Sequence, residues 1–258
     1  MVRNARLEDL GDAPRPIIAV GNEYGDGHVV PPHSHRRGQL LYGASGAVLV
    51  TTAQGAWVSP PQHGVWIPAG VVHEVRMLGA VNTRSLYLDA AAAASLPDRC
   101  QVVGISPFMR GLLAEAVDLP ATYDLHARAG ALMALIQHEM QRMPALPLSL
   151  PLPTHPELLR CCQDFLAAPS AHDHIEPWSR RLGIARRTFT RLFREETGLS
   201  FTLWRQQACL MAALSRLIAG DPVTTVALDL GYDNPAAFTT MFKRVLGAPP
   251  RAYLKENG

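Results

Sequence analysis

The sequence predicts an α+β protein of two domains, in which an antiparallel β-barrel with flanking helices precedes an all-α domain with two helix-turn-helix motifs. Short strand-like runs fill residues 17–89 between turn residues, as is typical of antiparallel barrels. Five prolines within residues 144–156 exclude a continuous helix there, and the pattern after them is helical only. We expect a barrel at 1–105, a helical region at 106–143, a linker at 144–156 and the helical domain at 157–258.

The composition is that of a folded chain in a reducing compartment. Its 258 residues are 48% hydrophobic and 18% charged, enough for one large core or two ordinary ones, which argues against disorder. The four cysteines form no C-x-x-C pair, so we expect free thiols. Residues 1–16 lack the features of a signal peptide, and no apolar run reaches the ~18 residues of a membrane span. These features predict a cytoplasmic protein without a membrane segment.

Basic residues are concentrated in the C-terminal part. Residues 1–155 contain 11 Lys and Arg against 12 Asp and Glu, whereas residues 156–258 contain 13 against 10. Of the 24 basic residues 22 are arginine, whose planar guanidinium matches phosphate groups and guanine edges. A cluster of this kind can also be a solvated helix face. The densest cluster, with no acid inside it, is Arg180, Arg181, Arg186, Arg187, Arg191 and Arg194.

The C-terminal part also contains an internal repeat of 49 residues. Apolar positions stay apolar under this shift, a basic position stays basic, and a helix-ending glycine is kept. Two copies of one supersecondary structure are therefore expected. The matching pairs are Phe189 with Phe238, Leu192 with Met241, Phe193 with Phe242, Arg194 with Lys243, Gly198 with Gly247 and Trp204 with Tyr253.

Each copy is predicted to be a helix-turn-helix. Phe189, Leu192 and Phe193 are spaced i, i+3, i+4 and form one buried stripe, which turns the basic residues outward. The stripe alone indicates only a core, but with a turn glycine and a short leading helix it indicates DNA binding. The helix, turn and helix of the two copies are 176–182, Gly183 and 186–195, then 223–230, Gly231 and 234–245.

The segment between the two copies predicts how far apart they lie. Residues 200–219 contain neither proline nor glycine, and they are predicted to form one helix of roughly 30 Å. Successive major-groove faces of B-DNA are about 34 Å apart. One rigid helix can thus place two recognition helices in adjacent grooves, so we expect double-stranded DNA as the partner.

Residues 156–258 resemble the AraC-type transcriptional regulators, and the run LDLGYDNPAAFTTMFKRVLGAPPRAY looks like the C-terminal signature of that family. The resemblance implies a transcription factor that works with RNA polymerase and is not an enzyme. By position it implies base contacts from Arg187, Thr190 and Arg191, flanked by Arg186 and Arg194, and from Pro235, Ala236 and Thr240. Since the last three are less polar than is usual, the second motif is expected to hold the DNA backbone through Asn234, Thr239 and Lys243.

Three histidines in the barrel form a second candidate site. His33 and His35 share one face of a predicted strand, Gln39 follows, and His73 comes after the turn at 68–70. The pattern resembles the cupin motifs H-x-H-x3-E-x6-G and P-x-G-x2-H, with Gln39 in place of Glu and a shortened second motif. The resemblance implies a small-molecule or metal effector, and three imidazoles suit Zn, Ni, Fe or Mn. The same residues can instead form a polar pocket floor that binds an organic ligand without metal.

An alternative function is that of a cupin-type metalloenzyme, an oxygenase or isomerase with an appended helical domain. That function predicts an ionised acid among the metal ligands. Gln39 stands at that position, and Glu74 is expected to point away from His73 on a strand. A further H-x-H at His172 and His174 lies in a polar loop and is a weaker ligand candidate. The sequence therefore favours an effector-responsive regulator.

Residues 106–143 are predicted to assemble a homodimer. A helix at 123–143 would carry a seam of coiled-coil type, interrupted at Glu139. Two DNA-binding domains on one particle would raise affinity through effective concentration. The alternative is that these apolar seam residues pack on the chain's own barrel. The seam residues are Leu125, Ala129, Leu132, Ile136 and Met143.

Overall fold

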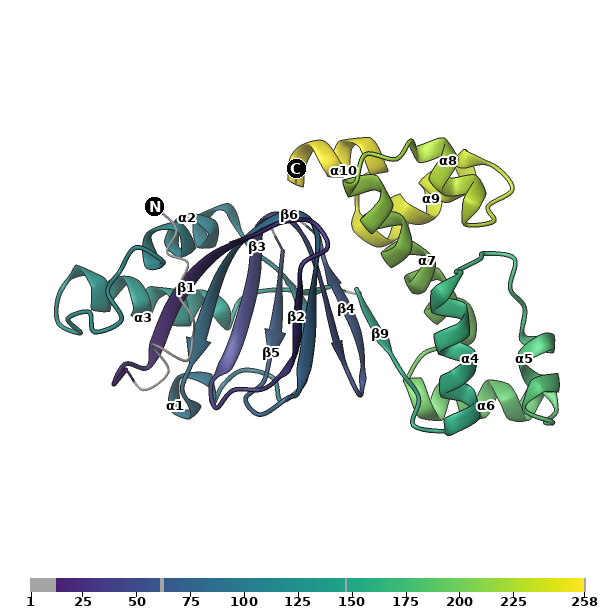
Figure 1. Ribbon diagram of the computed structural model, residues 1–258, viewed down its shortest axis with the longest axis horizontal. Coiled ribbons are helices and arrows are strands. Elements are labelled where there is room, and N and C mark those ends of the chain that lie inside the picture. Colours follow the sequence, from purple (N-terminus) through teal and green to yellow (C-terminus); the bar gives the residue numbers. More distant parts are fainter. Residues whose placement is uncertain (1–12, 61–62, 147, 258) are drawn as a thin grey trace. The chain divides into compact units, whose positions relative to one another are not determined.

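The computed structural model describes residues 13–60, 63–146 and 148–257, which form two compact units (Figure 1). Among these residues, the N-terminal unit contains those up to Thr52 and from Trp57 to Leu146. The C-terminal unit contains Ala53–Ala56 and the described residues after position 147. The chain passes from one unit to the other inside the proline-rich segment.

The N-terminal unit is built on a curved antiparallel sheet with helices beside it, which confirms the predicted fold class (Figure 1). The main path of paired strands is β1, β6, β3, β5, β7 and β8, while β2 pairs with β6 and β4 with β3. The pairings of β6 with β1, β2 and β3 are all antiparallel. The elements are β1 (Ile17–Tyr24), β2 (Val29–His33), β3 (Gly38–Thr52), β4 (Gly55–Ser59), β5 (His63–Ile67), β6 (His73–Leu88), α1 (Ala90–Ala93), β7 (Gln101–Gly104), α2 (Pro107–Ala116), α3 (Arg128–Met140) and β8 (Ala145–Leu146).

Strand β6 shows how alternation gives the sheet two different faces. Leu86 and Leu88 are buried in the core that α2 and α3 share with the sheet. Ser85 and Tyr87 alternate with them and therefore lie on the opposite face. The helices thus pack on one face of the sheet, and the opposite face can hold a polar site.

The helix predicted at 123–143 is shorter and packs differently from the prediction. It is α3, and its residues Leu132, Ile136 and Met140 are buried in the core with the sheet. The prediction of a dimer seam along this stripe is therefore wrong, because the stripe covers the chain's own sheet. An apolar helix face is buried by the nearest apolar surface, and here that surface is in the same chain. Leu125 lies before the helix and is 47% exposed.

The C-terminal unit is helical apart from the short strand β9 (Ser149–Pro151) and the start of β4, and both helix-turn-helix motifs lie where they were predicted. Helix α7 joins them and is about 27 Å long for its 18 residues. Within the described chain, no helix is both long enough and apolar enough to cross a membrane. The helices are α4 (Pro156–Ala167), α5 (Ile175–Arg181), α6 (Arg186–Thr197), α7 (Phe201–Ile218), α8 (Val223–Asp229), α9 (Pro235–Leu246) and α10 (Pro250–Asn257).

Equivalent residues of the repeat occupy equivalent places in the two motifs. The four repeated phenylalanines are fully buried, and Trp204 and Tyr253 are buried at matching positions. Gly198 ends α6 and Gly247 ends α9 with positive φ angles of 72° and 83°, which any other L-residue adopts only under strain. The repeat is therefore one of structure as well as sequence.

The segment predicted as a linker at 144–156 is more ordered than expected. β8 pairs with β7, β9 pairs with β4, and Trp204 Nε1 of α7 donates to the Pro151 carbonyl at 2.8 Å. Prolines exclude a helix but are compatible with short edge strands, where a missing N–H leaves no partner unpaired. At the end of this segment, Glu196 of α6 accepts bonds from the Thr154 amide, the Thr154 hydroxyl and the His155 amide at 2.7, 2.8 and 3.1 Å. We call residues 148–155 the strap.

Candidate DNA-binding and effector sites

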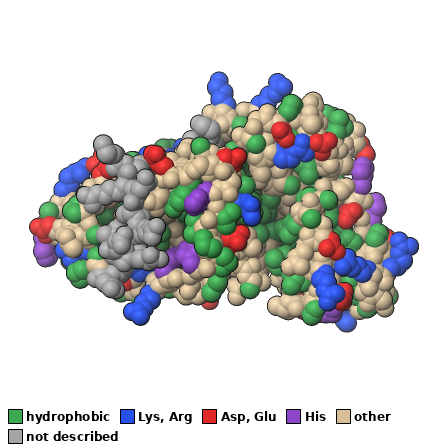
Figure 2. All heavy atoms as spheres, viewed as in Figure 1, with side chains coloured by type: hydrophobic (Ala, Val, Ile, Leu, Met, Phe, Trp, Pro, Cys, Tyr) green, Lys and Arg blue, Asp and Glu red, His purple; other side chains and the backbone are tan. Residues whose placement is uncertain are grey.

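Helix α6 presents the basic face that was predicted for the first motif. All five predicted residues are exposed, and they line one open depression of the surface. Figure 2 shows basic side chains over the region of α5 and α6, with acidic side chains among them. Ion pairs between such exposed side chains contribute little to stability, so a phosphate can replace the acidic partner of an arginine. The five residues are Arg186, Arg187, Thr190, Arg191 and Arg194, of which Arg186 lies 3.0 Å from Glu176 and Arg191 lies 3.8 Å from Glu195.

The buried side of α6 determines which of its residues face outward. Phe189 and Phe193 each pack against the ring of Trp178 in α5, with centroid distances of 6.3 Å. Gly183 forms the turn between the helices with a φ of 66°. Two phenylalanines one turn apart fix the rotation of the helix about its axis, so the basic residues on its other faces point to solvent.

Helix α9 offers fewer polar groups than α6, as the sequence indicated. The side-chain oxygen of Asn234 accepts a bond from the Ala237 amide at 2.8 Å and caps the helix. The oxygen of Asn234 therefore serves the helix, and its amide nitrogen is the group that can donate to a phosphate, as predicted for this residue. The exposed predicted residues are Asn234, Ala236, Thr240 and Lys243, and the half-buried ones are Pro235 and Thr239.

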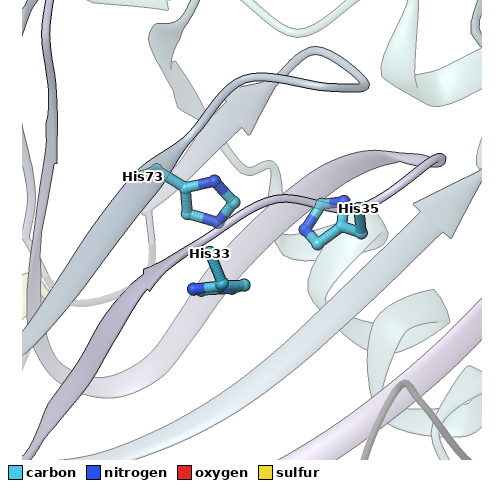
Figure 3. A group of neighbouring side chains, drawn as sticks. All are labelled: His33, His35 and His73. Atoms are coloured by element: carbon cyan, nitrogen blue, oxygen red, sulfur yellow. The ribbon is translucent and has the colours of Figure 1, made fainter.

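The structure brings the three predicted histidines together in the N-terminal unit (Figure 3). His33 ends β2 opposite His73 at the start of β6, and His35 follows two residues after His33. One ring nitrogen from each lies within 4.8 Å of the others. The ring centroids of His33 and His73 are 4.3 Å apart, and those of His35 and His73 are 5.2 Å apart.

Backbone carbonyls orient all three rings. Nδ1 of His33, His35 and His73 lies 2.8, 2.6 and 2.8 Å from the carbonyl oxygen two residues away in each case. A neutral ring that donates from Nδ1 carries its lone pair on Nε2, the atom that binds metals. His73 is 1% exposed, and its Nε2 has no hydrogen-bond partner among the described residues. Burial lowers the pKa of His73 to about 4 and also lowers the pKa of His35, so both rings are neutral at pH 7.

Gln39 lies beside the histidines, next to two polar residues that were not predicted. Its side-chain oxygen is 3.0 Å from His35 Nε2, and its nitrogen donates to the hydroxyls of Ser85 and Tyr87 at 3.3 and 3.0 Å. Burial raises the pKa of Tyr87, which keeps this hydroxyl protonated. Their alternation with two leucines in the predicted strand RSLYL was a usable signal for both residues.

These residues fit a divalent transition metal. Three ligand atoms at about 2.1 Å from one ion lie roughly 3.0–3.6 Å apart, so the three nitrogens, which lie within 4.8 Å of one another, would draw together by about 1–2 Å on binding an ion. In the neutral tautomer that donates from Nδ1, His35 Nε2 and the Gln39 oxygen are both acceptors, and they repel at 3.0 Å unless a cation lies between them. Their separation is that of adjacent ligands about 2.1 Å from an octahedral ion. A Gln39 amide turned by 180° would satisfy His35 without a metal.

The other candidate ligands lie outside this group. The described residues that converge as possible metal ligands are the three histidines without any acid, so Glu74 is not among them, as predicted. His172 Nε2 lies 3.9 Å from Asp233 Oδ1, and His174 precedes α5 as its N-terminal cap. The second H-x-H therefore lies in the C-terminal unit and is not part of the cluster of His33, His35 and His73.

Comparison with known proteins assigns both units. Residues 16–145 match the AraC-like ligand binding domain, and residues 178–256 match a helix-turn-helix domain. The chain is 34% identical to the HTH-type transcriptional regulator NimR of Escherichia coli (strain K12), over 87% of this chain and 82% of that protein. The chain belongs to the AraC family of transcriptional regulators. It is thus a DNA-binding regulator that responds to an effector ligand and is not an enzyme, as the sequence predicted.

This AraC-family regulator has further similarities of smaller extent. It is 28% identical to the arabinose operon regulatory protein of Salmonella typhimurium, over 48% of this chain and 44% of that protein. Among solved structures it is similar to the DNA-binding domain of AdpA in complex with a target DNA. That similarity has 30% identity over 36% of this chain and 86% of that chain, with a TM-score of 0.35.

Proposed function

We propose that this AraC-family regulator binds double-stranded DNA under the control of a divalent transition metal (Zn, Ni, Fe or Mn) held by His33, His35, Gln39 and His73. The observation that carries the proposal is the buried His73 Nε2, which lacks a partner among the described residues and lies with the other two imidazoles. Four neutral ligands leave the ion its full charge, so an anionic small molecule can join it as part of the effector. We place this function in the cytoplasm, where the DNA is accessible.

In this proposal α6 reads bases and α9 mainly holds the DNA backbone. Arginine side chains match guanine edges, whereas alanine and the threonine methyl offer only apolar contact to thymine. Phosphate contacts fix the register of the helix on the duplex. RNA polymerase is the further partner on which such a regulator acts. The proposed base readers are Arg187, Thr190 and Arg191 with Pro235, Ala236 and Thr240, and the proposed backbone contacts are Arg186, Arg194, Asn234, Thr239 and Lys243.

Elemental analysis of the purified full-length protein tests the metal. We expect about one transition-metal ion per chain, lost in His35→Ala and kept in the control His138→Ala, whose histidine is exposed on α3. Titration of labelled DNA with and without added metal then tests control of DNA binding. Metal that survives His35→Ala would exclude this site. A wild-type protein without metal, whose DNA affinity ignores added metal, would favour the metal-free polar pocket.

We also propose that the regulator is a homodimer. Most of the seam residues are buried inside the chain, but three large apolar residues around α2 and α3 stay exposed: Phe108, Leu125 and Leu135, at 55%, 47% and 39%. They lie on or next to α2 and α3, within the region 106–143 for which the sequence predicted this role. A dimer would carry two DNA-binding units on one particle and gain affinity through effective concentration.

A further inference from the structure

The loop between α4 and α5 contacts the turn of the second helix-turn-helix motif, about 60 residues away in the sequence. The Ala171 amide donates to the Leu230 carbonyl at 2.7 Å, at the end of α8. Gly231 follows with a φ of 73°, and a Cβ atom there would lie 2.6 Å from Ser170 Oγ and 3.0 Å from a ring carbon of His172. The loop and the turn are therefore in close contact at a position that only glycine permits.

The same loop is tied to the first motif and to the joining helix. The Asp173 carboxylate accepts a bond from Trp178 Nε1 of α5 at 3.4 Å. The Asp173 carbonyl accepts a bond from the guanidinium of Arg205, which is half-buried on α7. Inside the loop, the Asp173 amide donates to the Ser170 carbonyl at 3.3 Å, which closes a tight turn. One short turn thus bonds to α5, to α7 and to the end of α8.

Helix α7 by itself is a poor means of fixing the two motifs. It is bounded by glycine turns, with φ of 72° at Gly198 and 96° at Gly220, and backbone rotation is easiest at glycine. A second connection between the two motifs, outside α7, removes that freedom, because rotation at either glycine would break this connection. The loop supplies such a connection.

We propose that residues 170–173 form a clasp that fixes the spacing and angle between α6 and α9, and thereby the spacing of DNA segments that the regulator accepts. Arg205 and Gly231 are positioning residues in this proposal, since they act through the clasp. The proposal rests on the proposed reading of DNA by α6 and α9.

A spacing series of DNA sites tests the clasp. A site is first selected from random DNA with the full-length wild-type protein, and one or two base pairs are then inserted between the two protected segments. We expect the wild type to lose roughly tenfold or more in affinity on insertion. In His172→Ala/Arg205→Ala the ratio between the original and the stretched site should fall to about threefold or less. The single variant Arg205→Lys keeps a donor for the Asp173 carbonyl, so its affinity ratio between the original and the stretched site should equal that of the wild type.

The control Arg194→Ala should weaken both sites alike and leave the ratio unchanged, as would a mere loss of folded protein. A wild type that tolerates the insertions, or a double variant with the wild-type ratio, overturns the clasp. A footprint without two separated protected segments contradicts the proposed roles of α6 and α9 instead.

A distance measurement on the free protein tests the clasp without DNA. Spin labels on Thr188→Cys of α6 and Ala237→Cys of α9 are selective, because the four native cysteines are buried. We expect one narrow distance distribution, which broadens in Arg205→Ala, the variant that loses the bond to the Asp173 carbonyl. An unchanged width in that variant overturns the proposal whatever the DNA result.

Discussion

At the scale of single residues, the two recognition helices differ in the chemistry they can offer to a base. Arg191 is exposed on α6 and has a weak ionic partner at 3.8 Å, which it can exchange for DNA. Thr240 is exposed on α9 and has only a hydroxyl and a methyl group to offer. Specificity should therefore depend more on α6 than on α9.

We expect Arg191→Ala to weaken specific DNA binding by about 1–3 kcal/mol, and Thr240→Ala to weaken it by less. Titration of a selected, fluorescently labelled site measures both. Arg128→Ala serves as the control, because this arginine pairs with Glu115 in the N-terminal unit at 2.9 Å. Equal losses at Arg191 and Thr240 would contradict the division between the helices.

At the scale of elements, packing decides whether replacing a helical glycine by alanine stabilises the protein, which helix propensity alone would not predict. Gly111 and Gly130 both lie inside helices, α2 and α3, where alanine is intrinsically better by about 0.5–1 kcal/mol. A Cβ atom at Gly111 has no neighbour within 4 Å, whereas one at Gly130 would overlap the Leu125 backbone. Gly111→Ala should therefore raise the free energy of unfolding by about 0.5–1 kcal/mol, and Gly130→Ala should lower it by more than that. Urea unfolding measures both, and a gain at Gly130 would mean that this close approach does not exist in solution.

The end of the strap gives a second prediction at this scale. Hydrogen bonds from the Thr154 side chain and from backbone amides lower the pKa of Glu196 below its ordinary value of 4.5. Since the folded pKa is the lower one, this stabilisation is complete above the ordinary value and is lost as pH falls through the folded value. Glu196→Gln should cost more stability at pH 7 than at pH 3, while Glu195→Gln on the same helix should show a smaller difference. Urea unfolding at both pH values checks this, and an equal cost at the two would rule out the carboxylate as the cause.

At the scale of the whole molecule, the exposed apolar residues around α2 and α3 predict self-association. Full-length protein should sediment as a dimer at tens of micromolar, and Phe108→Ser/Leu135→Ser should sediment as a monomer with unchanged unfolding behaviour. Leu228→Ser is the matched control, because this leucine is 57% exposed on α8 of the other unit. A wild-type monomer, or a dimer that survives the double substitution, would contradict the proposed interface.

The sequence by itself determined the features that depend on local spacing. The repeat of 49 residues placed both motifs because buried phenylalanines and turn glycines are set by helical periodicity and by φ, which are local properties. The pair His33 and His35 was placed on one face by the two-residue period of a strand, whereas His73 was predicted as their partner by the resemblance to the cupin motifs.

The tertiary structure decided which surfaces meet. The apolar stripe of α3 was visible in the sequence, but periodicity says only which face is apolar and not whether a sheet or a second copy covers it. The bond from Ala171 to Leu230 and the bonds from the strap to Glu196 join residues about 60 and 40 positions apart, and no local pattern encodes such pairs. Their partners are chosen by the packing of whole helices, in which burial of apolar surface outweighs any single hydrogen bond.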